Sequence, residues 1–338
     1  MGRASGAAWG ALVAATALVA LGCDPSESGL PTDHFVEAFD VQPQGWLLSV
    51  AGSSETDLWA AGGIPGDGAM HHFDGSAWSD VPLPASTPLL DWVHVWSASS
   101  AIAVGDLGTA LAYDGTSWTA ESTPTTQNLW GAWGPSPDDV WAVGGNSVND
   151  TDATILRREA GVWRADPVPT LARPGVDAFF KVWGSSASDV WIVGRRGAIL
   201  HWDGAAYTEF DAGVGQDLIA VWGTGPNHVV AVGGRNNGIL AVYDGQTWTS
   251  HTLGAMPGLN GVWTRTPGVI HVAGGRGTLA VVDATGQVKR DLSLNTETDV
   301  HAVFGLPSGR LTGVGGNFLF ANGPYEGLAV WRTLESGE

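Results

Sequence analysis

The sequence is poor in two kinds of residue that decide how a protein is held together and what it binds. It contains a single cysteine, Cys23, among 338 residues, which excludes an intramolecular disulfide. Lysine and arginine together number 15 against 34 aspartates and glutamates, so the formal net charge is −19. Because nucleic-acid backbones are held by clustered basic side chains, this balance argues against a nucleic-acid partner.

The sequence also lacks the common catalytic motifs. No Gly-x-Ser-x-Gly, His-Glu-x-x-His or P-loop pattern occurs in it. Only four tyrosines are present, and none forms a convincing tyrosine–glutamate pair of the kind a sialidase requires. The nine histidines are scattered, and the adjacent pair His71 and His72 would point to opposite faces of a strand. We therefore expect no metal site and no cofactor, and an enzymatic activity is the less favoured interpretation.

The first 22 residues have the pattern of an export signal. Arg3 precedes an apolar stretch, Ala7 to Leu21, which is short for a membrane span but typical of a signal peptide. The stretch ends in Ala20-Leu21-Gly22-Cys23, which resembles the lipobox of bacterial lipoproteins, although Ala20 stands where that family usually has leucine. The resemblance implies that residues 1–22 are a lipoprotein signal peptide and that Cys23 is lipidated. It places the protein in the cell envelope, anchored on the periplasmic side of a membrane or at the cell surface.

Residues 23–33 are polar and contain proline, serine and glycine, which is typical of a flexible tether. When extended, this tether would reach roughly 30 Å. The remaining residues, 34–338, form the folded part in this interpretation.

One pattern recurs seven times in the folded part. An apolar strand ending in Val-Trp-Gly is followed by a polar turn, Val-Trp-Ala-Val-Gly, a third strand, Asp-Gly and a fourth strand with an aromatic residue. The first tryptophan of the pattern aligns at Ala51, Trp96, Trp133, Trp183, Trp222, Trp263 and Phe304. The mean step is about 42 residues, which matches the period of a four-stranded propeller blade. The sequence therefore predicts an all-β protein, a seven-bladed β-propeller with four-stranded antiparallel blades.

Two local features agree with this prediction. Runs such as Val140 to Val143 are apolar at successive positions, as expected for a strand that neighbouring blades cover on both faces. Asp-Gly pairs at 74–75, 114–115, 203–204 and 244–245 predict type I′ hairpins, which need a positive φ at both residues. These aspartates are interpreted as turn formers, in preference to calcium ligands.

Two alignments compete for the seventh blade. In the favoured one, residues 35–41 supply its outer strand, so that the N-terminal strand closes the ring, and Gly327 to Thr333 form its third strand. In the other, the third strand is Gly316 to Gly323, and Trp331 lies on the fourth.

The repeat resembles bacterial propellers of the Asp-box and Kelch-like kind. The resemblance is strongest to predicted lipoproteins with Trp-Gly-Ser-Ser-x-x-Asp-Val-Trp-x-Val-Gly repeats, and it covers residues 46 to about 334. The segment Asp244 to Trp248 is one residue shorter than a true Asp-box. The resemblance implies an architecture and leaves the function open, because propellers include enzymes, receptors and scaffolds.

The loops between second and third strands are expected to lie on one face of a propeller. In blades 1 to 3 these loops carry acidic residues, and in blades 4 to 6 they carry Arg195, Arg196, Arg235 and Arg276. Clustered arginines predict a site for an anionic group, such as a carboxylated glycan or the acidic surface of a partner. The alternative is that they are solvated residues paired with the abundant aspartates. In the first strands, Lys181 and His94 are predicted to share one position that faces the central channel.

Taken together, these patterns favour a non-enzymatic binding or assembly module, attached to a membrane by its lipid. Its expected partner is a protein or glycan of the cell envelope. The alternative function is a carbohydrate-active hydrolase of the sialidase-like propeller type.

Overall fold

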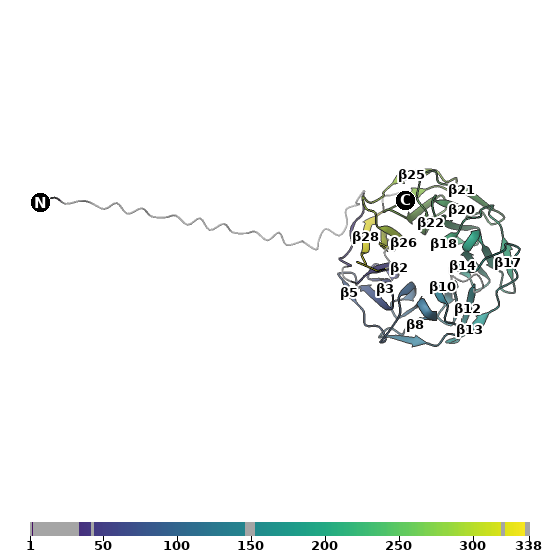
Figure 1. Ribbon diagram of the computed structural model, residues 1–338, viewed down its shortest axis with the longest axis horizontal. Coiled ribbons are helices and arrows are strands. Elements are labelled where there is room, and N and C mark those ends of the chain that lie inside the picture. The colour runs from purple at the N-terminus through teal and green to yellow at the C-terminus, as the bar shows by residue number, and fades with distance from the viewer. Residues whose placement is uncertain (1, 3–33, 42–43, 146–152, 319–321, 335–338) are drawn as a thin grey trace. The chain divides into compact units, whose positions relative to one another are not determined.

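Seven four-stranded antiparallel sheets stand in a ring around a central channel (Figure 1). The computed structural model describes residue 2 and residues 34–41, 44–145, 153–318 and 322–334. The predicted signal peptide, Cys23 and the tether therefore lie outside the described part, apart from residue 2. The prediction of a seven-bladed all-β propeller is confirmed. No helix in the described ranges is long and apolar enough to cross a membrane.

The blades follow one another along the chain, each from its innermost to its outermost strand. Blades 1 and 2 comprise β2 (Trp46–Ser54), β3 (Asp57–Ile64), β4 (Asp67–Phe73) and β5 (Trp78–Asp80), then β6 (Leu90–Ser97), β7 (Ser100–Gly105), β8 (Ala110–Tyr113) and β9 (Trp118–Glu121). Blades 3 and 4 comprise β10 (Asn128–Ser136), β11 (Asp139–Gly145), β12 (Thr154–Glu159) and β13 (Val162–Asp166), then β14 (Phe179–Ser186), β15 (Asp189–Gly194), β16 (Ile199–Trp202) and β17 (Tyr207–Phe210). Blades 5 and 6 comprise β18 (Leu218–Gly225), β19 (His228–Gly233), β20 (Ile239–Tyr243) and β21 (Trp248–Thr252), then β22 (Leu259–Thr266), β23 (Val269–Gly274), β24 (Leu279–Val282) and β25 (Val288–Asp291). Short 3-10 turns, η1 (Asp106–Gly108) and η2 (Arg195–Gly197), connect second to third strands in blades 2 and 4.

Blade 7 joins the two ends of the folded part. It consists of β26 (Asp299–Gly305), β27 (Arg310–Gly316), β28 (Gly327–Thr333) and β1 (Val36–Glu37), in that order from the channel outward. Val36 pairs with Trp331, which lies on the third strand. The favoured closure is confirmed, and the competing alignment is wrong, because Gly316 ends the second strand and Trp331 does not lie on the fourth.

The Asp-Gly hairpins differ from the predicted turn type. Phe73 pairs with Trp78, which leaves a four-residue loop between the strands. Gly75 has a φ of 97°, whereas Asp74 is not among the residues with a positive φ, so type I′ geometry is wrong here. The turn-forming role of the aspartate is confirmed, because its Oδ1 accepts hydrogen bonds from the backbone N–H groups of Ser76 and Ala77 at 2.8 and 2.9 Å.

Consecutive blades interlock through a tryptophan and a glycine. A Cβ atom added at Gly184 would lie 2.5 Å from the ring of Trp133, and one added at Gly223 would lie 2.5 Å from the ring of Trp183. Since real Cβ atoms do not approach a ring this closely, the glycines provide the space in which the tryptophans pack. Where a glycine of the next blade faces it, as at Trp133 and Trp183, the first tryptophan of the repeat is therefore a contact between blades.

The strand pairing corrects the repeat alignment in blade 2. Leu90 pairs with Gly105 as Leu129 pairs with Gly144, so the equivalent of Trp133 is His94, not Trp96. The same register makes Lys181 equivalent to Trp92. The prediction that Lys181 and His94 share one position is therefore wrong by two residues. Val95-Trp96 resembles the Val-Trp of the repeat in sequence but lies two residues further on. The Nε atoms of both Trp96 and His94 reach the carbonyl of Gly134 in the next blade, at 2.8 and 3.2 Å.

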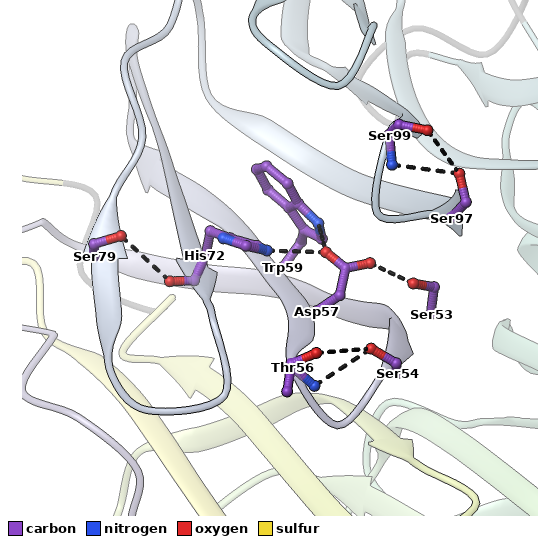
Figure 2. A network of polar contacts seen from close by, with 9 residues as sticks. All are labelled: Ser53, Ser54, Thr56, Asp57, Trp59, His72, Ser79, Ser97 and Ser99. Carbon is purple, nitrogen blue, oxygen red and sulfur yellow. Dashed lines mark hydrogen bonds and ion pairs between the residues drawn. The ribbon is translucent and has the colours of Figure 1, made fainter.

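A buried polar network joins three strands of blade 1 (Figure 2). Asp57, only 2% exposed, accepts hydrogen bonds from Trp59 Nε1 at 2.8 Å, from His72 Nε2 at 2.9 Å and from Ser53. Blade 4 repeats this arrangement with Asp189, Trp191, His201 and Ser185. Because the carboxylate is satisfied by neighbours within its own blade, we assign these histidines a structural role.

Candidate functional site

The innermost strands share a β-bulge near their first residue. In blade 1 the pairing passes from Leu47 to Ser49 and leaves Leu48 without a partner. The same shift occurs in every blade, and the bulged residues are Leu48, Asp91, Trp130, Phe180, Ile219, Asn260 and His301. A bulge re-aims a side chain away from the alternation of a strand. All seven residues line a single cavity.

This cavity is the mouth of the central channel and has a volume of about 420 Å³. Arg235, from the loop between β19 and β20, and Phe318, from the connection between β27 and β28, also line it. The mouth therefore lies on the face that carries the second-to-third strand loops. Trp46 completes its aromatic rim, at 5.4 Å between ring centroids from Phe318.

A second cavity of about 260 Å³ continues the channel, and it shares Asn260 and His301 with the mouth. Trp222 lines it, in contrast to Trp133 and Trp183, which pack on glycines of the next blade. The next blade has Thr264 in place of that glycine, and the Trp222 indole donates to the Thr264 carbonyl at 3.2 Å. Trp222 thus borders the channel in the blade whose neighbour has no glycine at this position.

Lys181 on β14 lies beneath the mouth. Its side chain reaches across blades, because Nζ donates to the carbonyl of Trp130 and lies 4.6 Å from the ring centroid of Trp92. The residue is only 5% exposed. Burial lowers the pKa of Lys181 to about 8, and the charge of Asp91 opposes this shift.

Asp91 on β6 lines the same cavity. Burial raises the pKa of its carboxyl well above the usual range, the charge of Asp106 adds to the shift, and Lys181 opposes it. Its Oδ2 atom is buried and has no hydrogen-bond partner among the described residues. The mouth thus combines a buried cation and a partly buried carboxyl group with aromatic walls.

The two channel histidines predict a loss of stability in acid. Burial lowers the pKa of His301 to about 3, with a contribution from Lys181, and burial lowers the pKa of His94 to about 4. In the unfolded chain both titrate near 6.5. Between these values the unfolded state binds more protons, so the free energy of unfolding falls as pH decreases from about 6.5, by up to about 1.4 kcal/mol per pH unit for each histidine.

Urea unfolding at a series of pH values measures this effect. Between pH 6 and about 4, the free energy of unfolding should change less steeply with pH in a His94→Phe, His301→Phe double variant than in the wild type. An unchanged slope would show that the carboxyl groups alone account for the acid sensitivity.

The structure places the four arginines of the predicted anion site in different settings. Arg195 is paired with the buried Asp177, Arg235 with Asp217 at 2.7 Å, and Arg276 with Glu297 at 3.8 Å. The side chain of Arg196 is exposed, and its backbone N–H donates to Asp217 at 2.9 Å. Of the four, Arg235 lines the mouth cavity. Three of them are paired with carboxylates, as the alternative interpretation expected, and a binding role stays a prediction.

Most of the mouth is not recognisable from the sequence. Trp130, Phe180 and Trp46 stand next to apolar residues, where an aromatic side chain indicates packing between blades. The available signal is the residue that follows the first leucine, phenylalanine or valine of each inner strand, since that position is the bulge in every blade.

No family model matches the sequence, and no curated protein matches it. Solved structures match its fold. The WD40 propeller domain of Doa1 aligns with a TM-score of 0.69 at 10% identity, over 89% of this chain and 98% of that one. YCF48 bound to D1 peptide aligns with a TM-score of 0.65 at 13% identity, over 90% and 99%. Virginiamycin B lyase from Staphylococcus aureus aligns with a TM-score of 0.69 at 10% identity, over 89% and 99%. These similarities define the class of the chain, a β-propeller, and at such identities they show the fold alone.

Proposed function

We propose that this chain is a non-enzymatic binding module of the cell envelope that holds its partner at the mouth of the channel. The observation that carries the proposal is the convergence of all seven bulged residues on one cavity. A concave, largely apolar site with a few convergent polar groups is typical of binding pockets. One propeller of the same fold has been solved with a bound peptide, which is compatible with a binding role for such a ring.

The proposal includes export and anchoring through the lipid on Cys23, supported by the lipobox-like sequence that ends there. The closing strand begins at Val36, 13 residues further along the chain. The tether therefore joins the folded part at the strand that completes blade 7. Anchoring and ring closure involve neighbouring segments of the chain.

Crosslinking in the native host followed by purification of the tagged full chain tests the proposal. A Trp130→Ser, Phe180→Ser double variant should lose at least about tenfold of the captured partner, because it removes the apolar walls of the mouth. Val162→Ser is the control, since Val162 is exposed on the outer strand β13. Equal capture by both variants would contradict the proposal.

A Cys23→Ser variant tests the lipid anchor in the same preparation. This variant should be lost from the membrane fraction, and its retention there would contradict lipid anchoring.

One observation favours the alternative, a carbohydrate-active hydrolase. Two carboxyl groups, Asp91 and Asp299, line the mouth, and the raised pKa of Asp91 suits a general acid. Against it, Asp299 Oδ1 already accepts the backbone N–H of Arg276 at 2.9 Å. A hydrolase would lose turnover of its glycan in Asp91→Asn, whereas a binding module has no turnover to lose.

A further inference from the structure

We propose that the mouth cavity binds an organic carboxylate through the ammonium group of Lys181, with the apolar group next to that carboxylate held by the aromatic rim. This inference rests on the proposed function and specifies its ligand. The C-terminal residue of a polypeptide, with an aromatic or branched side chain, has this chemistry.

The first argument is the incomplete coordination of Lys181. An ammonium group has three N–H donors, and the carbonyl of Trp130 is its hydrogen-bond acceptor in the structure. Although the residue is only 5% exposed, it forms no ion pair with any carboxylate in the described part of the chain. Lysine is rarely buried without a counter-ion, because the cost of desolvating its charge is then not offset. A bound anion would supply the missing partner.

The second argument is that the nearest carboxyl group does not fill this role. Asp91 faces the same cavity but lies beyond ion-pair distance of Lys181, and burial favours its protonated form. In its protonated form, Asp91 would carry no charge to offset that of Lys181.

Among the other ionisable groups that line the mouth, the two that can carry a positive charge are paired or neutral. Arg235 is paired with Asp217 at 2.7 Å, and Asp299 accepts from the backbone of Arg276. His301 is uncharged at neutral pH, because its pKa is lowered to about 3, and its Nδ1–H donates to the Leu48 carbonyl at 2.7 Å. Lys181 is therefore the cation whose charge is left for a ligand.

The third argument is the shape of the rest of the cavity. Its walls include the side chains of Trp46, Leu48, Trp130, Phe180, Ile219 and Phe318. Its volume of about 420 Å³ lies within the usual range for small-molecule pockets. These walls favour an aromatic or branched aliphatic group beside the carboxylate, in contrast to a uronic acid, whose ring carries hydroxyl groups.

Calorimetry at pH 7 tests the inference. It compares the affinity of the purified full chain for 3-phenylpropionate with its affinity for 3-phenylpropionamide. The acid should bind at least about ten times more tightly than the amide, a preference that should disappear in Lys181→Met. Lys289→Met is the matched control, because Lys289 is half exposed and paired with Asp283 at 2.8 Å. The preference should also decline as pH rises through about 8, where Lys181 loses its proton.

A second readout shows that Lys181→Met is folded. Because methionine removes a buried charge while keeping the length of the side chain, this variant should unfold at a temperature at least as high as the wild type. A variant that gains stability while losing the acid preference supports a binding role for the lysine.

Three results would overturn the inference. The first is that the wild type binds the acid no more tightly than the amide, or binds neither. The second is that Lys181→Met keeps the preference for the acid. The third is that the wild type binds galacturonate as tightly as 3-phenylpropionate. These results are distinct from failure of the proposed function. If capture of the partner is lost in the Trp130→Ser, Phe180→Ser variant and retained in Lys181→Met, the mouth binds a partner that does not present a carboxylate there.

Discussion

Deleting residues 34–41 should unfold the whole ring in one cooperative transition at a much lower temperature. These residues contain β1, which covers the outer edge of β28, and two buried side chains, Phe35 and Val41, at 7% and 3% exposure. The ring of Phe35 also lies 5.7 Å from the guanidinium of the fully buried Arg332. Removing one buried phenylalanine alone costs about 3 to 5 kcal/mol, a large share of the roughly 5 to 15 kcal/mol that stabilises a typical domain.

Thermal unfolding followed by circular dichroism and by tryptophan fluorescence measures this effect. Both signals should shift together, because each blade packs on two neighbours and an open ring exposes a face at each end. Deletion of residues 24–30, which belong to the predicted tether, is the control and should leave the midpoint unchanged. A truncated chain with the wild-type midpoint would show that β1 does not close the ring.

Gly223→Val should destabilise the contact between blades 4 and 5 by about 3 kcal/mol, the upper end of the usual cost of overpacking. The first atom of the new side chain would lie 2.5 Å from the buried ring of Trp183, which is only 7% exposed. The ring would have to leave its position over the glycine or push the blades apart. Gly215→Ala is the control, because a Cβ atom at Gly215 meets nothing within 4 Å.

A second substitution at the contact partner tests the mechanism. In a Trp183→Ala background, Gly223→Val should cost at least about 1 kcal/mol less than in the wild type, a coupling expected of residues in contact. The double variant copies a pair that the chain already has, since Ala51 and Val95 occupy the equivalent positions in blades 1 and 2 and pack in one cluster. Equal costs in both backgrounds, measured by urea unfolding, would show that the effect of Gly223→Val does not arise from Trp183.

The number of blades and their closure could be predicted from the sequence for a physical reason. Inner strands such as Val140 to Val143 are covered on both faces, so they form apolar runs that recur with the blade period. The closing strand was recognisable because the spacing from residues 35–41 to Ala51 matches the spacing of outer strands elsewhere. Both signals come from regular packing, which repeats from blade to blade.

The mouth could not be predicted in the same way, because it depends on departures from regularity. The bulge that directs Trp130 or Phe180 into the channel leaves no mark in an apolar run. The cavity also assembles positions from Trp46 to Phe318, which only the closed ring brings together. The charge of the four loop arginines predicts an anion site. Three of them are paired with nearby carboxylates, and Arg235 is the one that lines the cavity.

The central claim is that the partner binds at the mouth of the channel, and a photo-crosslinking amino acid placed at single positions in cells tests it most directly. Ile219 lies at the bulge of blade 5, and Gln246 lies in the β20–β21 hairpin at the opposite end of the same blade. We expect a covalent adduct with one defined partner from position 219 and none from position 246. An adduct from position 246 together with none from position 219 would contradict the claim.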